Sequence, residues 1–280
     1  MSVINTNVNA LFAQNSMKTN ARSMSSAMQK LSTGSRINAA GDDAAGLAIG
    51  QSMTAQVRGL NMAVRNANDG INMMQTAEGA MVEQTNMLQR MRELAVQSTN
   101  GTYSSTQRSY LQTEFEQLGT QITAISTDTT WNGTQLLSGT SKIGVTATSG
   151  SFDFQVGQNS GQTISIAIGD MSLSTLTASA SLDISTASGA SSAISTLDTA
   201  LEAINSQRAT IGAGINRLTY ASDNLTNISS NISASKSTIM DTDYAEASTQ
   251  LSKTQIIQQA ATAMLAQANQ QPQSVLSLLK

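Results

Sequence analysis

Two long helical patterns, one toward each end of the chain, constrain this sequence more than any other feature. Near the start, side chains recur at alternating steps of four and three, which is the spacing of a seam along one helix face. They are Met17, Ala21, Met24, Met28 and Leu31. After a break at Thr33 and Gly34, a longer seam runs from Met53 to Leu88 without a proline. It predicts a helix from about Ala44 to Gln97, roughly 80 Å long at about 1.5 Å per residue.

The middle of the chain changes period. A third helical segment extends from Tyr110 to Ile125 and is followed by a turn signal at Asn132 and Gly133. Apolar and polar residues then alternate over residues 143–147, 152–156 and 164–168. Alternation predicts strands, so three short antiparallel strands are expected here. Residues 172–192 are rich in Ser, Thr, Ala and Gly, and we expect a loop or weakly ordered surface segment.

The C-terminal third returns to the helical period between Leu197 and Ile239. A break at residues 241–243 precedes a final helix, which is expected to end near Asn269 because Pro272, the only proline, lies just beyond it. The predicted fold is mainly α: an elongated antiparallel helical bundle or coiled coil formed by both termini, with a small central β-hairpin region.

Composition excludes most enzyme chemistry. The chain has no Cys and no His, which supply most thiol nucleophiles, soft-metal ligands and proton shuttles at neutral pH. We therefore expect no catalytic residues, no metal site and no cofactor. The acidic pairs Asp42–Asp43 and Asp241–Asp243 stand before helices and are predicted to cap them, with Glu246 completing the second cap. A net charge of -3 gives no attraction to nucleic acid or an anionic membrane.

Both extreme ends carry apolar residues without enough neighbouring large side chains to bury them. They are Val3, Ile4, Val8, Leu11 and Phe12 at one end, and Val275, Leu276, Leu278 and Leu279 at the other. Burial of these side chains alone would not offset the entropy lost in ordering the terminal segments. We therefore expect that copies of the chain complete each other's cores, and that residues 1–31 and 243–280 become ordered on association.

Several longer motifs resemble the bacterial flagellin family. They are MSVINTNVNAL at residues 1–11, LSTGSRIN at 31–38, DDAAGLAI at 42–49, QTAEGA at 75–80, LQRMRELAVQ at 88–97, AQANQ at 266–270 and VLSLL at 275–279. The resemblance covers about residues 1–139 and 195–280, in the family's order. It leaves only a short middle region, which implies a minimal two-layer subunit without large outer domains.

The resemblance implies an extracellular subunit of the flagellar filament that polymerises for motility, leaves the cell by type III export without a cleaved signal, and is not an enzyme. Implied partners are other copies, an export chaperone, and the filament cap and junction proteins. The expected parts are a filament-core helix and linker (1–43), outer helical segments (44–139 and 196–240), a β-hairpin region and exposed loop (140–195), and a second filament-core helix (241–280). The nine terminal apolar residues are the expected filament-core contacts.

The same resemblance suggests a receptor surface. Arg90 and Leu94 lie one turn apart on the long helix, and with Glu114 they resemble the flagellin surface bound by Toll-like receptor 5 of vertebrates. Subunit contacts within the filament are the simpler interpretation of the same residues. Two other functions stay open from the sequence: a hook-filament junction protein, and a secreted coiled-coil adhesin.

Overall fold

The computed structural model describes residues 7–139, 150–178 and 182–277, with side chains described as far as residue 270. The chain is mainly helical, with two small β-hairpins. It divides into two units of internal contact: Met1–Val57 with Ser230–Lys280, and Arg58–Ser229. The long helices α2 (Ala44–Thr99) and α5 (Ala187–Met240) belong to both units.

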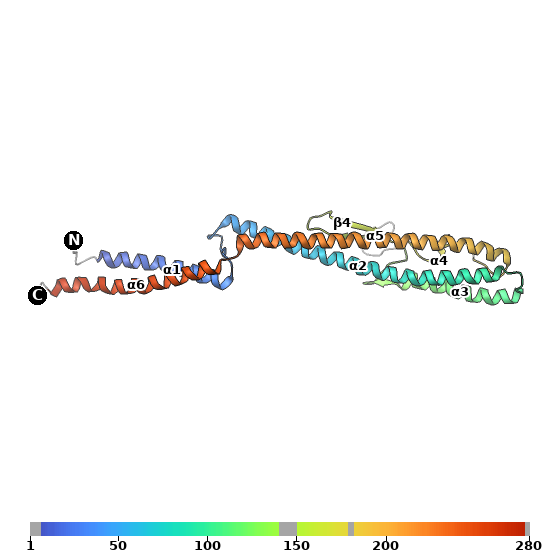
Figure 1. Ribbon diagram of the computed structural model, residues 1–280, viewed down its shortest axis with the longest axis horizontal. Coiled ribbons are helices and arrows are strands. Elements are labelled where there is room, and N and C mark those ends of the chain that lie inside the picture. The colour runs from blue at the N-terminus through green and yellow to red at the C-terminus, as the bar shows by residue number, and fades with distance from the viewer. Residues whose placement is uncertain (1–6, 140–149, 179–181, 278–280) are drawn as a thin grey trace. The chain divides into compact units, whose positions relative to one another are not determined.

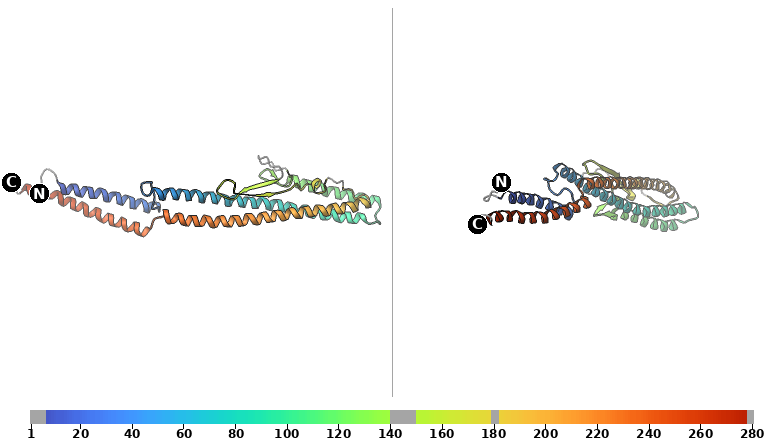
Figure 2. Two further views of the ribbon diagram at one scale, coloured as in Figure 1. Left: turned by 90° about the horizontal axis from the view of Figure 1, so that it is seen from above. Right: turned by 60° about the vertical axis from the view of Figure 1, so that its left-hand side comes forward.

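In the first unit, α1 (Val8–Thr33) and α6 (Tyr244–Ser277) lie side by side and antiparallel (Figures 1 and 2). The Asn7 side chain caps the start of α1 by accepting from the N–H of Ala10. Gly34 ends it in the left-handed conformation at φ 71, which glycine adopts without steric cost. The predicted break at Thr33 and Gly34 is confirmed.

Helix α6 does not end before Pro272, so that prediction is wrong. The helix continues to Ser277 with the proline inside it. Proline lacks an N–H, and the carbonyl of Ala268, four residues earlier, therefore has no donor within the helix. The Asn7 amide instead donates to that carbonyl at 2.8 Å. A contact from the other end of the chain thus supplies the hydrogen bond that the proline removes.

In the second unit, α2, α3 (Ser105–Asp128) and α5 pack together around one apolar core (Figure 1). The predicted long helix is confirmed within two residues at its C-terminal end. Its seam is buried at positions seven residues apart: Leu60, Ala67, Met74, Met81 and Leu88. The Ser104 hydroxyl and the Gln107 side chain form a reciprocal capping box at the start of α3.

Two antiparallel hairpins complete this unit. Strands β1 (Thr130–Trp131) and β2 (Thr134–Gln135) are joined by Asn132 and Gly133, both with positive φ, as the turn signal predicts. Strands β3 (Ser151–Gln155) and β4 (Thr163–Ala167) pair with Phe152 opposite Ile166. These match the second and third predicted strands. The first, at residues 143–147, falls outside the described residues.

Outside residues 179–181, the stretch 172–192 is more regular than expected. It contains the short helix α4 (Leu173–Leu176) and the first turns of α5, which begins at Ala187. The cause is three side chains spaced through the Ser- and Thr-rich segment, because Leu176, Ile184 and Ala190 are buried in the core. The sequence-based expectation weighed the Ser- and Thr-rich composition of this segment and overlooked its few apolar residues, which pack in the core.

Candidate functional site

The surface between α1 and α6 is an alanine-rich seam. Buried and half-buried positions follow steps of three and four on both helices. On α1 they include Ala10, Ala13, Met17, Asn20, Met24, Ala27 and Leu31, and on α6 Ala247, Leu251, Thr254, Gln258, Ala261, Leu265 and Ala268. A seam was predicted on α1, but its membership was partly wrong, because Met28 is 53% exposed whereas Asn20 and Ala27 are buried.

Several large apolar side chains on this pair point away from the seam. Phe12 is 75% exposed, and Met264 and Ile256 are each 66% exposed. Phe12 and Met264 line one groove together with Ala13 and Ala268. Val8 and Leu11, two further predicted contact residues, are also exposed. Helices with a small-residue seam and exposed large apolar residues present a surface suited to further chains.

The remaining predicted terminal contacts cannot be placed. Val3, Ile4, Leu278 and Leu279 fall outside the described residues, and Val275 and Leu276 lie in α6 beyond its described side chains.

Hydrogen bonds join the link that follows α1 to the link between α5 and α6 in the first unit. Arg36 donates its backbone N–H to the Met240 carbonyl at 2.7 Å, and its guanidinium to the Ile239 carbonyl at 2.6 Å. Thr242 returns a backbone bond to Gly34. A cation at the end of α5 also suits the negative end of the helix dipole. The link after α1 therefore caps the end of α5.

Only half of the predicted acidic caps are confirmed. Asp43 accepts from the N–H of Gly46 at the start of α2, and Asp243 accepts from Ala245 and Glu246 at the start of α6. Asp42 instead accepts from Asn38 and Ala39 within the link, and Asp241 accepts from the Ser237 hydroxyl. The neighbouring carboxylates thus have different tasks, because only one of each pair reaches the helix N-terminus. The bonds from Asn38 and then Ala39 lower the pKa of Asp42.

Arg90 is the centre of an exposed ion cluster in the second unit. Its guanidinium contacts Glu93 at 3.0 Å and Glu114 of α3 at 2.9 Å. These hydrogen bonds, first to Glu93 and then to Glu114, raise the pKa of Arg90. The expectation that Leu94 shares this face is wrong, because Leu94 is only 1% exposed and belongs to the core. Arg90 and Leu94 are one helical turn apart, and the boundary between the exposed and the buried face of α2 lies between them.

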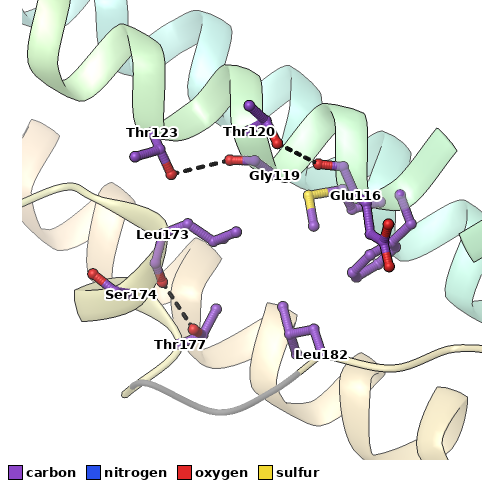
Figure 3. A pocket seen from close by; sticks show the side chains of 10 residues that line it. Glu116, Gly119, Thr120, Thr123, Leu173, Ser174, Thr177 and Leu182 are labelled. Atoms are coloured by element: carbon purple, nitrogen blue, oxygen red, sulfur yellow. Dashed lines mark hydrogen bonds between the residues drawn. The ribbon is translucent and has the colours of Figure 1, made fainter. Parts of the chain in front are cut away.

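A hollow of about 620 Å³ lies beside α3 and α4, and Glu116 is the one carboxylate among its lining residues (Figure 3). Leu173 and Leu182 line it opposite Gly119 and Glu116. The hydroxyls of Thr120, Thr123 and Thr177 each donate to a carbonyl of their own helix or turn. Within the described part of the chain, no three acidic side chains gather as metal ligands would. None of the described helices combines the length and apolar character of a membrane span.

A helical subunit with exposed large apolar residues on its terminal helix pair has the character of a structural protein that assembles. Residues 4–142 match the bacterial flagellin N-terminal helical region, and residues 194–279 match the bacterial flagellin C-terminal helical region. The chain belongs to the bacterial flagellin family. It is therefore a structural subunit of the extracellular flagellar filament, which forms by polymerisation of copies, and not an enzyme.

Relatives match over nearly the whole chain. A flagellin of Halalkalibacterium halodurans is 46% identical, with 99% of this chain and 100% of the relative covered. The flagellar filament 33 kDa core protein of Treponema phagedenis is 42% identical, again over 99% and 100%. A flagellin of Bacillus subtilis is 42% identical, with 99% of each chain covered. The crystal structure of Bacillus cereus flagellin superposes with a TM-score of 0.51 at 32% identity, over 61% of this chain and 94% of that one.

Proposed function

We propose that α1 and α6 form the assembly surface of this filament subunit, and that neighbouring copies complete the burial of the pair. One observation carries the proposal: large apolar residues of the pair, with Phe12 foremost, face away from the seam. Full burial of a side chain of this kind contributes about 1.5–3 kcal/mol. The terminal helices therefore gain most of their stability on assembly, and the monomer keeps them only marginally folded.

Seeded polymerisation tests this assignment. Monomer is added to filament fragments, and growth is followed by sedimentation and electron microscopy. Phe12→Ser and Met264→Ser should each slow growth and raise the concentration of monomer left at equilibrium. Lys18→Ser, on an exposed position of α1, is the matched control. Growth of both apolar variants at the control rate would remove α1 and α6 from the assembly surface, and failure of the parent to grow would favour a junction protein or an adhesin.

The second proposal concerns a vertebrate receptor. The exposed cluster of Arg90, Glu93 and Glu114 offers a rigid arrangement of charge on α2 and α3 that Toll-like receptor 5 could bind in the monomer. Leu94 supports this surface from beneath by packing in the core. We assign the direct contacts to Arg90 and Glu114.

A reporter-cell assay with purified monomer separates recognition from folding. Arg90→Ala with Glu114→Ala should weaken signalling at least tenfold. The control removes the pair Arg92–Asp198, which is similarly exposed and joins α2 to α5 at 2.6 Å. Equal signalling by both double variants and the parent would refute the assignment.

Export and assembly partners follow from the same role. We propose that the chain leaves the cell by type III export without cleavage, bound beforehand by an export chaperone, and that it joins the filament between junction and cap proteins. Intact mass of protein from native filaments tests the first point. A mass that corresponds to a chain shortened at its N-terminus by more than the initiator methionine would contradict it.

A further inference from the structure

The seam between α1 and α6 contains little that distinguishes one alignment of the helices from another. Seven residues on either side of Thr254, the same seam position of α6 is occupied by alanine, at Ala247 and Ala261. On α1, Ala13 and Ala27 stand in the same relation to Asn20. A shift of α6 by seven residues would therefore exchange only alanine and threonine along the row Ala247, Thr254, Ala261 and Ala268. The helices need other groups to select one register.

Asn20 is the first such group. It is 8% exposed, and its amide donates to the Thr254 carbonyl at 2.8 Å and to the Gln258 side-chain oxygen at 3.2 Å. A shift of seven residues in either direction would put Leu251 or Leu265 in the place of Gln258. The buried amide would then meet an apolar side chain. A polar residue at a seam position of a coiled coil specifies register in this way.

Asn7 is the second group, and its partner is the carbonyl that Pro272 leaves without a helical donor. Its side-chain oxygen caps α1, and its amide donates to the Ala268 carbonyl. That carbonyl lacks a helical donor because Pro272 is the only proline. A shift of α6 that brought Ala261 to Asn7 would present a carbonyl that already accepts from the N–H of Leu265 within the helix. Asn7 and Asn20 are thirteen residues apart, and their partners Ala268 and Thr254 are fourteen residues apart in the opposite direction. Both bonds are therefore compatible with one antiparallel register.

We propose that Asn20 and Asn7 are positioning residues that fix the register of α1 against α6, with Pro272 creating the acceptor for Asn7. Each lock should give roughly a tenfold preference for the native alignment over a shift by seven residues. The inference uses the helix pair of the proposed assembly surface, but it concerns alignment within one chain. Filament growth and register can therefore fail separately in experiments.

Cysteine cross-linking measures the register directly, because the chain has no cysteine of its own. The native alignment places Ala13 beside Ala261, and both line one groove. The pair Ala13→Cys with Ala261→Cys should cross-link on oxidation, whereas Ala13→Cys with Thr254→Cys or with Ala268→Cys reports a shift in one direction or the other. Each pair is tested in polymerised full-length protein and in monomer.

In the parent sequence, only the native pair should form a disulfide in high yield. With Asn20→Leu and Asn7→Ser together, the shifted pairs should gain at least about tenfold in yield. Serine at position 7 still caps α1 but has no amide. Asn15→Leu, the same change at an exposed position of α1, should leave the yields unchanged. Shifted yields that remain at the parent level in the double variant would overturn the proposal.

Amide hydrogen exchange provides a second test, which does not require the double variant to assemble. Asn7→Ser should speed amide exchange near Ala268 several-fold in the parent. In a Pro272→Ala background, the new N–H satisfies the Ala268 carbonyl, so the same change should have little effect there. Equal effects of Asn7→Ser in both backgrounds would show that the asparagine does not act through the acceptor that Pro272 creates.

Discussion

Replacing Gly214 with alanine should disturb the seat of the β3–β4 hairpin on α5. A Cβ at this position would lie 2.6 Å from Cδ1 of Ile166, the buried β4 residue opposite Phe152. Gly212, two residues earlier on the same helix, has nothing within 4 Å of the corresponding position. Gly214 thus faces the β3–β4 hairpin, whereas Gly212 on the same helix faces open space.

The expected magnitudes follow from two opposing effects. Alanine in a helix interior is about 1 kcal/mol more stable than glycine. Overpacking of a filled site costs about 1–3 kcal/mol. Gly212→Ala should therefore stabilise the second unit by about 1 kcal/mol, whereas Gly214→Ala should be neutral or destabilise it by up to about 2 kcal/mol.

Urea unfolding of the monomer gives the difference between the two variants, and hydrogen exchange of the β3 and β4 amides locates it. Helix α2 offers a second pair, because a Cβ at Gly70 would lie 2.8 Å from Phe154, whereas Gly79 faces open space. If Gly214→Ala and Gly70→Ala stabilised the protein as much as their partners do, the hairpin would not be seated on these glycines.

Three further results are expected. Leu94→Ala should destabilise the second unit by about 2–5 kcal/mol, because the side chain is buried, whereas half-exposed Val96→Ala should cost no more than about 0.5 kcal/mol; thermal unfolding would contradict this if the losses were equal. Asp43→Ala and Asp243→Ala should each cost about 1 kcal/mol in urea unfolding, and more than Asp241→Ala, which caps no helix. Because the pKa of Asp42 is lowered in the folded state, its carboxylate stabilises the fold above the ordinary pKa of about 3.9, and this stabilisation is lost as pH falls through the folded value. The difference in unfolding free energy between the parent and Asp42→Asn should therefore shrink between pH 6 and pH 3. A constant difference would argue against the hydrogen bonds from Asn38 and Ala39.

The sequence predicted the long helices well because their seams are built from large aliphatic and Met side chains with a clear period. Leu60, Met74 and Leu88 are buried as that period requires. The alternating runs at residues 152–156 and 164–168 likewise became the paired strands β3 and β4. Sequence periodicity predicts an element correctly where the large side chains are also the buried ones.

The α1–α6 seam was harder to predict because large side chains and buried positions do not coincide there. On α1 the seam uses Asn20 and Ala27, while Met28 faces outward. A search for large apolar residues therefore shifted part of the seam by one residue. Signals that could have located it are the alanines and the asparagine that recur every seven residues from Ala13 to Ala27.

Two other differences depend on contacts that no local pattern contains. Continuation of α6 through Pro272 is accompanied by a bond from Asn7, 261 residues away from Ala268 in sequence. Leu94 is buried in the core shared with other elements, whereas Arg90, one turn earlier on the same helix, is half exposed. Tertiary packing sets both outcomes.

Amide hydrogen exchange before and after polymerisation tests most directly whether neighbouring copies complete the α1–α6 pair. In monomer, amides of residues 8–31 and 244–270 should exchange much faster than those of the α2 and α5 core around Met81 and Ile204. In filaments, protection of both terminal segments should rise by several orders of magnitude. Strong protection of these segments already in the monomer, unchanged by polymerisation, would contradict the account.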